Sequence, residues 1–221
     1  MPLRDPLLLA LLGGAAASLV VLLERRRRAR QTVLDRWAAQ QGMRCERAPP
    51  LSVLAPLEPM GLLPPVVAVE RLVDGVLRAP PLVVSLTLAA CLCGNRHRSR
   101  PFVLAVFAGP PELPTLRLMP ETDDEGRDDL GLLPVPAEGL PPGYRAESFQ
   151  DLPPQLLAAL GAELRGARAV RVELRPGRML LAAPADSVHE VDGLVHLGLR
   201  LLQASEWALR TPPPPAGTRL N

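Results

Sequence analysis

The most conspicuous absence in this chain is lysine, since all 25 basic residues among its 221 are arginine. Without lysine the chain has no P-loop lysine for a nucleotide phosphate, no amine for a Schiff base and no Ser-Lys dyad. Enzymes that depend on any of these groups are therefore excluded.

Aromatic residues and cysteines are also scarce. Aromatic residues make up 3% of the chain, too few for base-stacking platforms, and a net charge of +2 does not indicate a broad nucleic-acid surface. The three cysteines, Cys45, Cys91 and Cys93, are too few for a disulfide scaffold, which agrees with a reducing compartment. We therefore expect no nucleic-acid partner.

Recognisable catalytic motifs are missing as well. The sequence contains no Gly-x-Ser-x-Gly motif, no plausible Ser/His/Asp grouping and no glycine-rich phosphate loop. We predict no catalytic residue and no cofactor, and the sequence favours a protein that is not an enzyme.

What the chain does have is an apolar run near its N-terminus, from Pro6 to Leu23. At ~1.5 Å per residue a helix over this run is roughly 27 Å long, close to the ~30 Å hydrocarbon thickness of a bilayer. The run predicts an N-terminal transmembrane anchor over residues 1–23.

A block of arginines follows this run directly. The block consists of Arg25, Arg26, Arg27, Arg28 and Arg30. Basic residues beside a membrane helix stay on the cytoplasmic side, so the block predicts an outside N-terminus and a cytoplasmic domain. Each arginine near an anionic leaflet contributes on the order of 1 kcal/mol, which makes the lipid bilayer and its anionic head groups expected partners.

Together these features predict a single-pass protein of the bacterial inner membrane. The bacterial source is indicated by abundant Ala, Leu, Gly and Pro beside an all-arginine basic set, which is typical of GC-rich coding. The alternative is a cleaved signal peptide and an exported envelope protein. Signal peptides carry their positive charge before the apolar stretch and small residues at its end, whereas Gly13, Gly14 and Ala15 lie in the middle of this run.

The rest of the chain predicts a basic juxtamembrane helix over 24–42, a single α+β domain over 43–209 and a disordered proline-rich tail over 210–221. Helical spacing places Val33, Leu34, Trp37 and Ala38 on one face before Gly42, a suitable C-terminal cap. Six prolines within 48–65 predict a turn-rich connector. In the domain we expect a compact antiparallel sheet with packed helices.

Alternating apolar residues and turn signals divide the domain into expected elements. Asp74-Gly75 predicts a turn that joins strands 66–72 and 76–78 in a hairpin. Further expected strands cover 82–93, 102–107, 116–119, 170–174 and 179–183. Helices are expected after Pro153-Pro154 and after Asp186 or Ser187, the latter running to about Leu209.

The order of these pieces resembles an uncharacterised family of bacterial single-pass, membrane-anchored hypothetical proteins. The segments that carry the resemblance are Trp37 to Arg44, Cys91 to Phe107, Leu152 to Leu164, Val170 to Leu181 and Val188 to Leu202. The resemblance covers about two-thirds of the chain and implies one compact α+β domain on an anchor. It implies no activity, ligand or catalytic residue.

The best metal candidate is Cys91 and Cys93 with His97 just beyond them. Residues two apart in a strand point to the same face, so both thiols can address one ion, with Cys45 as a conceivable fourth zinc ligand. Cysteines in an apolar strand are more often small core residues, and the sequence favours that interpretation. A second candidate, His189 with Asp192 and His196 on one helix face, is more consistent with a solvated surface.

The sequence therefore predicts a membrane-anchored cytoplasmic module that binds or scaffolds an unknown protein partner. The alternative is a metal-dependent or otherwise unrecognised enzyme built around Cys91, Cys93 and His97.

Overall fold

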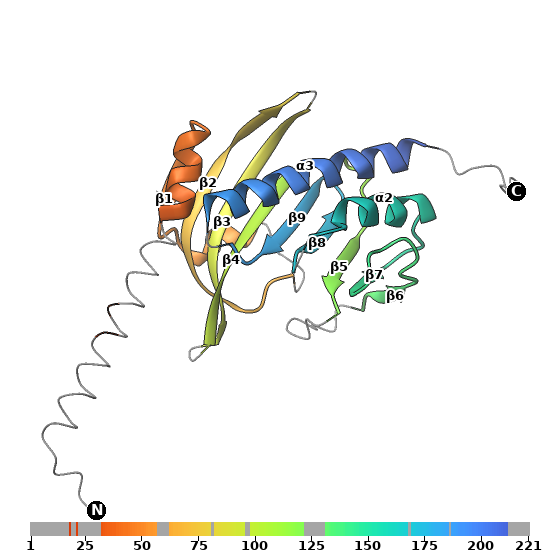
Figure 1. The fold of residues 1–221 in the computed structure, drawn as a ribbon, viewed down its shortest axis with the longest axis horizontal. Coiled ribbons are helices and arrows are strands. Elements are labelled where there is room, and N and C mark those ends of the chain that lie inside the picture. The colour runs from red at the N-terminus through yellow and green to blue at the C-terminus, as the bar shows by residue number, and fades with distance from the viewer. Residues whose placement is uncertain are drawn as a thin grey trace, which may run out of the picture.

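A nine-stranded antiparallel sheet forms the body of the molecule, in the order β1-β2-β3-β4-β9-β8-β5-β7-β6 (Figure 1). The computed structural model describes residues 18, 21, 32–56, 62–80, 82–95, 98–121, 131–167, 169–185 and 187–211. The strands are β1 (Arg44–Arg47), β2 (Val66–Ala79), β3 (Leu82–Asn95), β4 (Arg98–Ala108), β5 (Leu116–Pro120), β6 (Leu133–Val135), β7 (Tyr144–Ser148), β8 (Arg171–Arg175) and β9 (Arg178–Ala183).

The helices are α2 (Pro154–Leu164), α3 (Val188–Arg210) and the short 3-10 helix η1 (Leu51–Leu54), and residues 32–40 are also helical. Ser187 caps α3 as predicted, because its Oγ accepts from the Glu190 backbone N–H while its hydroxyl lies 3.0 Å from the Glu190 carboxylate. Gly42 ends the first helical segment at a φ of +66°, and Met43 N–H donates to the Ala38 carbonyl at 2.8 Å. The predicted glycine cap is therefore confirmed.

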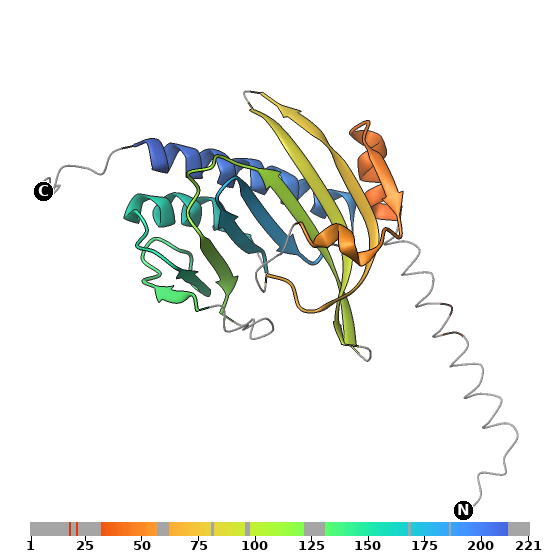
Figure 2. The same cartoon turned by 180° about the vertical axis from the view of Figure 1, so that it is seen from behind.

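The sheet buries side chains on both of its faces. On one face α2, α3 and residues 32–40 cover the first core, in which Phe107, Leu88 and Leu201 are fully buried (Figure 1). On the other face the described parts of the connector between β1 and β2, residues 48–56 and 62–65, supply Leu54 and Leu62 to the second core (Figure 2). The proline-rich connector is thus a structural cover for one side of the sheet.

The predicted hairpin at Asp74-Gly75 is wrong. β2 continues through both residues to Ala79, and its register with β3 pairs Asp74 with Thr87 and Gly75 with Leu86. A Cβ on Gly75 would lie 2.9 Å from the Met43 Sδ, so this glycine makes room for a side chain that packs over the strand. The close approach of the Met43 side chain, and not a turn, explains why glycine stands at position 75.

The predicted hairpin at the other end of the chain is confirmed. β8 and β9 pair from Arg171↔Ala182 to Arg175↔Arg178 around Pro176-Gly177. Gly177 adopts a φ of +81°, which only glycine adopts readily. The predicted helix after Pro153 is also confirmed as α2, with Leu156, Leu160 and Leu164 buried.

The predicted fold class, an α+β domain preceded by a transmembrane helix, requires correction. The structure has one large antiparallel sheet with helices against it, and no helix within the described ranges is both long and apolar enough to span a bilayer. α3, with its 23 residues, directs its apolar side chains into the first core and leaves its other face polar. Its apolar stripe is therefore explained by packing against the sheet.

The prediction of a single-pass inner-membrane protein with an outside N-terminus and a cytoplasmic domain is corrected by the same finding. Of the predicted anchor over 1–23, only Ser18 and Val21 belong to the described residues. The arginine block Arg25, Arg26, Arg27, Arg28 and Arg30, which was expected to bind anionic head groups, lies outside them, as does the predicted tail beyond Thr211.

Candidate functional site

A groove of about 540 Å³ opens where the end of α2, the loop leading to β8 and the first half of α3 meet. Its volume lies within the ~300–1,000 Å³ that is usual for small-molecule sites. The residues that line it are Glu163, Arg165, Gly166, Ala167, Val170, Ala183, Pro184, His189, Glu190, Gly193, Leu194, Leu197 and Arg200.

The floor of this groove is apolar. Leu194 and Leu197 come from α3, and Val170 and Ala183 come from the ends of the β8–β9 hairpin. All four belong to the first core and are buried. They lie together because α3 crosses this end of the sheet (Figure 1) and packs its apolar side chains into the first core. A ligand in the groove would therefore contact the surface of the core.

The rim of the groove carries charges of both signs. Arg200 Nε donates to Glu163 Oε2 at 2.8 Å and so joins α3 to α2 across the groove. Arg165, His189 and Glu190 are exposed around the same opening. Both hydrogen-bond donors and acceptors thus surround the apolar floor.

Tyr144 fixes the loop that forms one wall. Its hydroxyl lies 3.0 Å from the Val170 carbonyl and 3.3 Å from the Ala167 carbonyl, which places a donor between two wall residues. Burial raises the pKa of the Tyr144 hydroxyl, although the hydrogen bond to Val170 acts in the opposite direction. The phenol therefore remains a donor, and the wall keeps its position.

Gly193 leaves the groove open on the α3 side. A Cβ built at Gly193 would meet no atom within 4 Å, whereas one built at Gly198, on the same helix, would lie 2.3 Å from the Phe107 ring. Gly198 is needed for packing. Gly193 instead borders open space, so a larger residue can replace it without displacing the backbone.

The predicted group of His189, Asp192 and His196 divides between two roles. His189 lines the groove, while Asp192 faces residues 32–40, where its Oδ1 accepts from Trp37 Nε1 at 3.4 Å. His196 Nε2 lies 3.5 Å from Asp192 Oδ2 and is mostly exposed. His189 and His196 are exposed, as a solvated face requires, but neither the groove nor the contact with Trp37 was predicted from the sequence.

The predicted metal candidates are not brought together with Cys45. Cys91 and Cys93 belong to the second core, whereas Cys45 packs against the first core on the opposite face of the sheet. His97 lies outside the described residues. Within the described part of the chain, no three His, Cys, Asp or Glu side chains form a group that could hold a metal ion.

The environment of the two core thiols opposes ionisation. Burial raises the pKa of Cys93 to about 12, against which the charge of Arg171 acts only partly. Burial, and then the neighbouring Cys93 and Glu70, raise the pKa of Cys91 further. Metal binding and thiol nucleophilic chemistry both require the thiolate. The geometry therefore supports the core interpretation of these cysteines.

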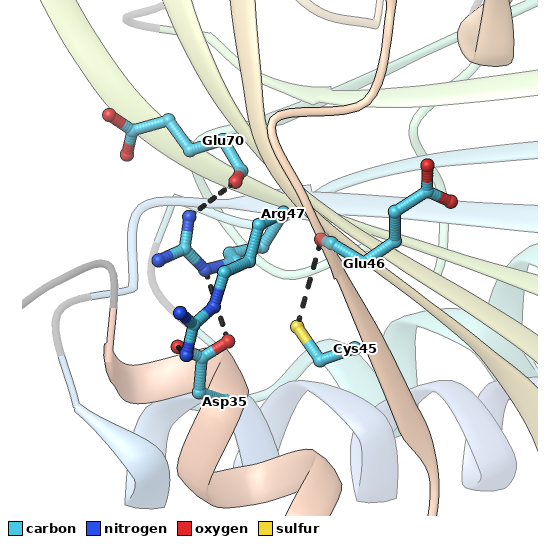
Figure 3. A network of polar contacts seen from close by, with 6 residues as sticks. Asp35, Cys45, Glu46, Arg47 and Glu70 are labelled. Carbon is cyan, nitrogen blue, oxygen red and sulfur yellow. Dashed lines mark hydrogen bonds and ion pairs between the residues drawn. The ribbon is translucent and has the colours of Figure 1, made fainter.

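Cys45 takes part in a different polar cluster, centred on Asp35 (Figure 3). Arg71 Nε donates to Asp35 Oδ1 at 3.0 Å, and Arg47 lies 3.5 Å from Asp35 Oδ2. Burial raises the pKa of Asp35, but hydrogen bonds from Cys45 and Arg71 and the charges of Arg71 and Arg47 outweigh it, so that the pKa is lowered. Burial and then Asp35 raise the pKa of Cys45 to about 12.

A row of charged side chains crosses three strands on the face of the second core. Glu173 of β8 pairs in register with Arg117 of β5, which in turn pairs with Glu147 of β7. Arg117 Nε donates to Glu147 Oε2 at 2.8 Å, and Glu173 forms an ion pair with Arg175. Glu173 is fully buried and Arg117 is 3% exposed.

This row of charges was not predicted from the sequence. The signal was the alternation Arg171-Val172-Glu173-Leu174-Arg175, which puts three charges on one face of a strand. Because alternation of this kind normally indicates a solvated face, burial of these charges could not be inferred from it.

No protein-family model matches the chain, and no curated protein matches it. Among solved structures, the chain is similar to the crystal structure of the mycobacterial trehalose monomycolate transport factor A, TtfA, with a TM-score of 0.52. The alignment covers 84% of this chain and 96% of that one, at 14% sequence identity. At this identity the likeness establishes a shared fold.

Proposed function

We propose that this chain is a binding module related to lipid transport, and that the groove between α2 and α3 holds an amphiphilic ligand. The observation that carries the proposal is the pairing of an apolar floor with a charged rim. Leu194 and Leu197 offer core surface to an acyl chain, while Glu163, Arg165 and Arg200 offer hydrogen bonds to a polar head group.

The fold likeness supports a ligand of this kind. The similar protein is described as a trehalose monomycolate transport factor, and the likeness spans most of both chains. Among the described residues that line the groove, His189 has no serine, cysteine or threonine beside it, so this part of the lining offers no activated nucleophile pair.

The proposal is tested by filling the groove. In Gly193→Phe the new ring enters open space and covers Leu194 and Leu197, so ligand affinity should fall at least tenfold. The probe is a monoacyl lipid with a dye on its acyl chain, titrated into the full chain below its critical micelle concentration and followed by fluorescence anisotropy.

The matched control is Gly193→Ala, which changes the same position but leaves the floor accessible. This variant should bind the probe as the parent chain does. Failure of the parent chain to bind, or equal binding by all three proteins, would contradict the proposal.

A further inference from the structure

The strand β1 leaves one edge of the sheet open. Among the described residues, β1 pairs with β2 on one side and with no strand on the other, and its residues are mostly exposed. The opposite edge, β6, has only three residues and contains Pro134, which cannot donate a backbone hydrogen bond. Of the two edges, β1 is the one able to accept another strand.

The pairing of β1 with β2 shows which backbone groups face outward. Ala48 N–H donates to the Glu70 carbonyl at 3.0 Å, so in this antiparallel ladder Ala48, Glu46 and Arg44 direct their backbone groups toward β2. Cys45 and Arg47 therefore direct their N–H and C=O groups outward. Met43 offers only its carbonyl, because its N–H is bonded to Ala38.

These groups fit a second β1 strand in an antiparallel register centred on Cys45. Cys45 would then exchange two hydrogen bonds with Cys45 of the second copy, and each Arg47 N–H would donate to the Met43 carbonyl opposite. The occupied Met43 N–H is not required in this register. A two-fold axis through the Cys45 pair makes the contact self-complementary.

The exposed charges favour the same register. With Cys45 opposite Cys45, each Arg44 lies opposite a Glu46 of the other copy. Glu46 lies on the side of β1 that faces away from Asp35 (Figure 3), and Arg44, two residues before it in the strand, shares that side. Shifting the centre to Glu46 would place two glutamates opposite each other, and a centre between Cys45 and Glu46 would place Arg44 opposite Arg47. Opposite charges across strands are favourable and like charges are not.

We propose that β1 pairs with β1 of a second copy of this chain, in a two-fold antiparallel arrangement centred on Cys45. The paired strands join the two sheets into one continuous sheet. Because only one short strand from each copy takes part, the dimer exchanges with monomer and depends on protein and salt concentration. The surface is distinct from the α2–α3 groove, so Gly193→Phe leaves it unchanged.

Cys45 itself reports on the register. A hydrogen-bonded antiparallel pair has a Cα–Cα distance of ~5.5 Å, within the ~4.4–6.8 Å range of disulfides. Prolonged oxidation of the full chain with diamide at alkaline pH, where part of the Cys45 thiol ionises despite its raised pKa, should therefore trap a covalent dimer as the diamide takes up the two thiol hydrogens. Cys45→Ser should abolish this covalent dimer, since the two remaining thiols, Cys91 and Cys93, are buried.

A charge-swap series decides between this register and random collision. Arg44→Glu and Glu46→Arg, each alone, put like charges opposite each other and should weaken the dimer at least tenfold in sedimentation equilibrium at low salt. The double variant R44E/E46R restores opposite charges and should recover the parental affinity. A parent chain that is monomeric throughout, or single variants that dimerise and cross-link as the parent does, would overturn the proposal.

Discussion

Several charged side chains in this protein form ion pairs with specific neighbours, and Asp35 is the clearest example. Its carboxylate receives a hydrogen bond from the largely buried Arg71 and lies near Arg47, which ties the helical residues 32–40 to the first two strands. The carboxylate has a lowered pKa for this reason.

Replacing Asp35 with asparagine should lower the free energy of unfolding by about 1–2 kcal/mol near neutral pH, since a charge-assisted hydrogen bond is lost. Because the folded pKa is below the unfolded value of ~3.9, this stabilisation is complete above about pH 5 and is lost as pH falls through the folded pKa. Urea unfolding of both proteins from pH 7 to pH 2.5 should show the difference shrink toward acid. A difference that stays constant down to pH 2.5 would argue against the assigned interaction.

The buried Glu173 carboxylate should contribute more to the free energy of unfolding than Asp35 does. Substitution by glutamine removes the charge while the guanidinium of Arg175 stays beside it and Arg117 remains its cross-strand neighbour. We expect a loss of about 3–5 kcal/mol in the free energy of unfolding, as for one partner removed from a buried ion pair. The same change at the exposed Glu112 should alter it by less than about 0.5 kcal/mol. Equal effects in urea unfolding would show that the charge row contributes nothing.

At the scale of elements, α3 combines two glycines with opposite requirements. Gly198 is buried against the Phe107 ring, and Gly193 lies at the open groove. Gly198→Ala should destabilise the protein by about 1–3 kcal/mol through overpacking, while Gly193→Ala should stabilise it by about 0.5–1 kcal/mol through helix propensity. Thermal and urea unfolding of the pair provide the measurement, and effects of the same sign would refute the assigned packing.

Elements whose signals are local could be predicted from the sequence, and elements set by distant contacts could not. Ser187 and Gly42 act through hydrogen bonds to nearby backbone groups, so their positions predict helix ends. Gly75 depends on a contact with Met43, the residue that precedes β1, and this distant contact gave no local signal, so the glycine was wrongly predicted to form a turn. The groove likewise could not be predicted from the sequence, because Glu163 and Arg200 come from two helices whose contact no sequence pattern indicates.

For the whole molecule, the two cores share the central strands. β4 directs Phe107 to the first core and Leu104 to the second, and β9 likewise contributes Leu181 and Leu180. Since neither core can lose its strands alone, we expect both to unfold in one cooperative transition.

Leu62→Ala in the connector tests this coupling, because it creates a cavity in the second core only. The free energy of unfolding should fall by about 2–5 kcal/mol. The fluorescence of Trp37, buried in the first core, and far-UV circular dichroism should report the same shifted midpoint, measured in a Trp207→Phe background so that the exposed Trp207 is silent. Two separate midpoints would mean that the cores unfold independently.

The pairing of β4 with β9 has a consequence for biosynthesis. Strands β1 to β4 are joined to the rest of the sheet by this pairing, which sets Val103 against Ala183. During translation the ribosome delivers β4 long before β9, so the first half of the sheet emerges with an apolar strand and an unpaired edge. Completion of the fold waits for the last quarter of the chain, and such non-local closure is slow. Nascent chains stalled before β9 are consequently the species on which chaperones should act, and refolding yield should fall steeply as protein concentration rises.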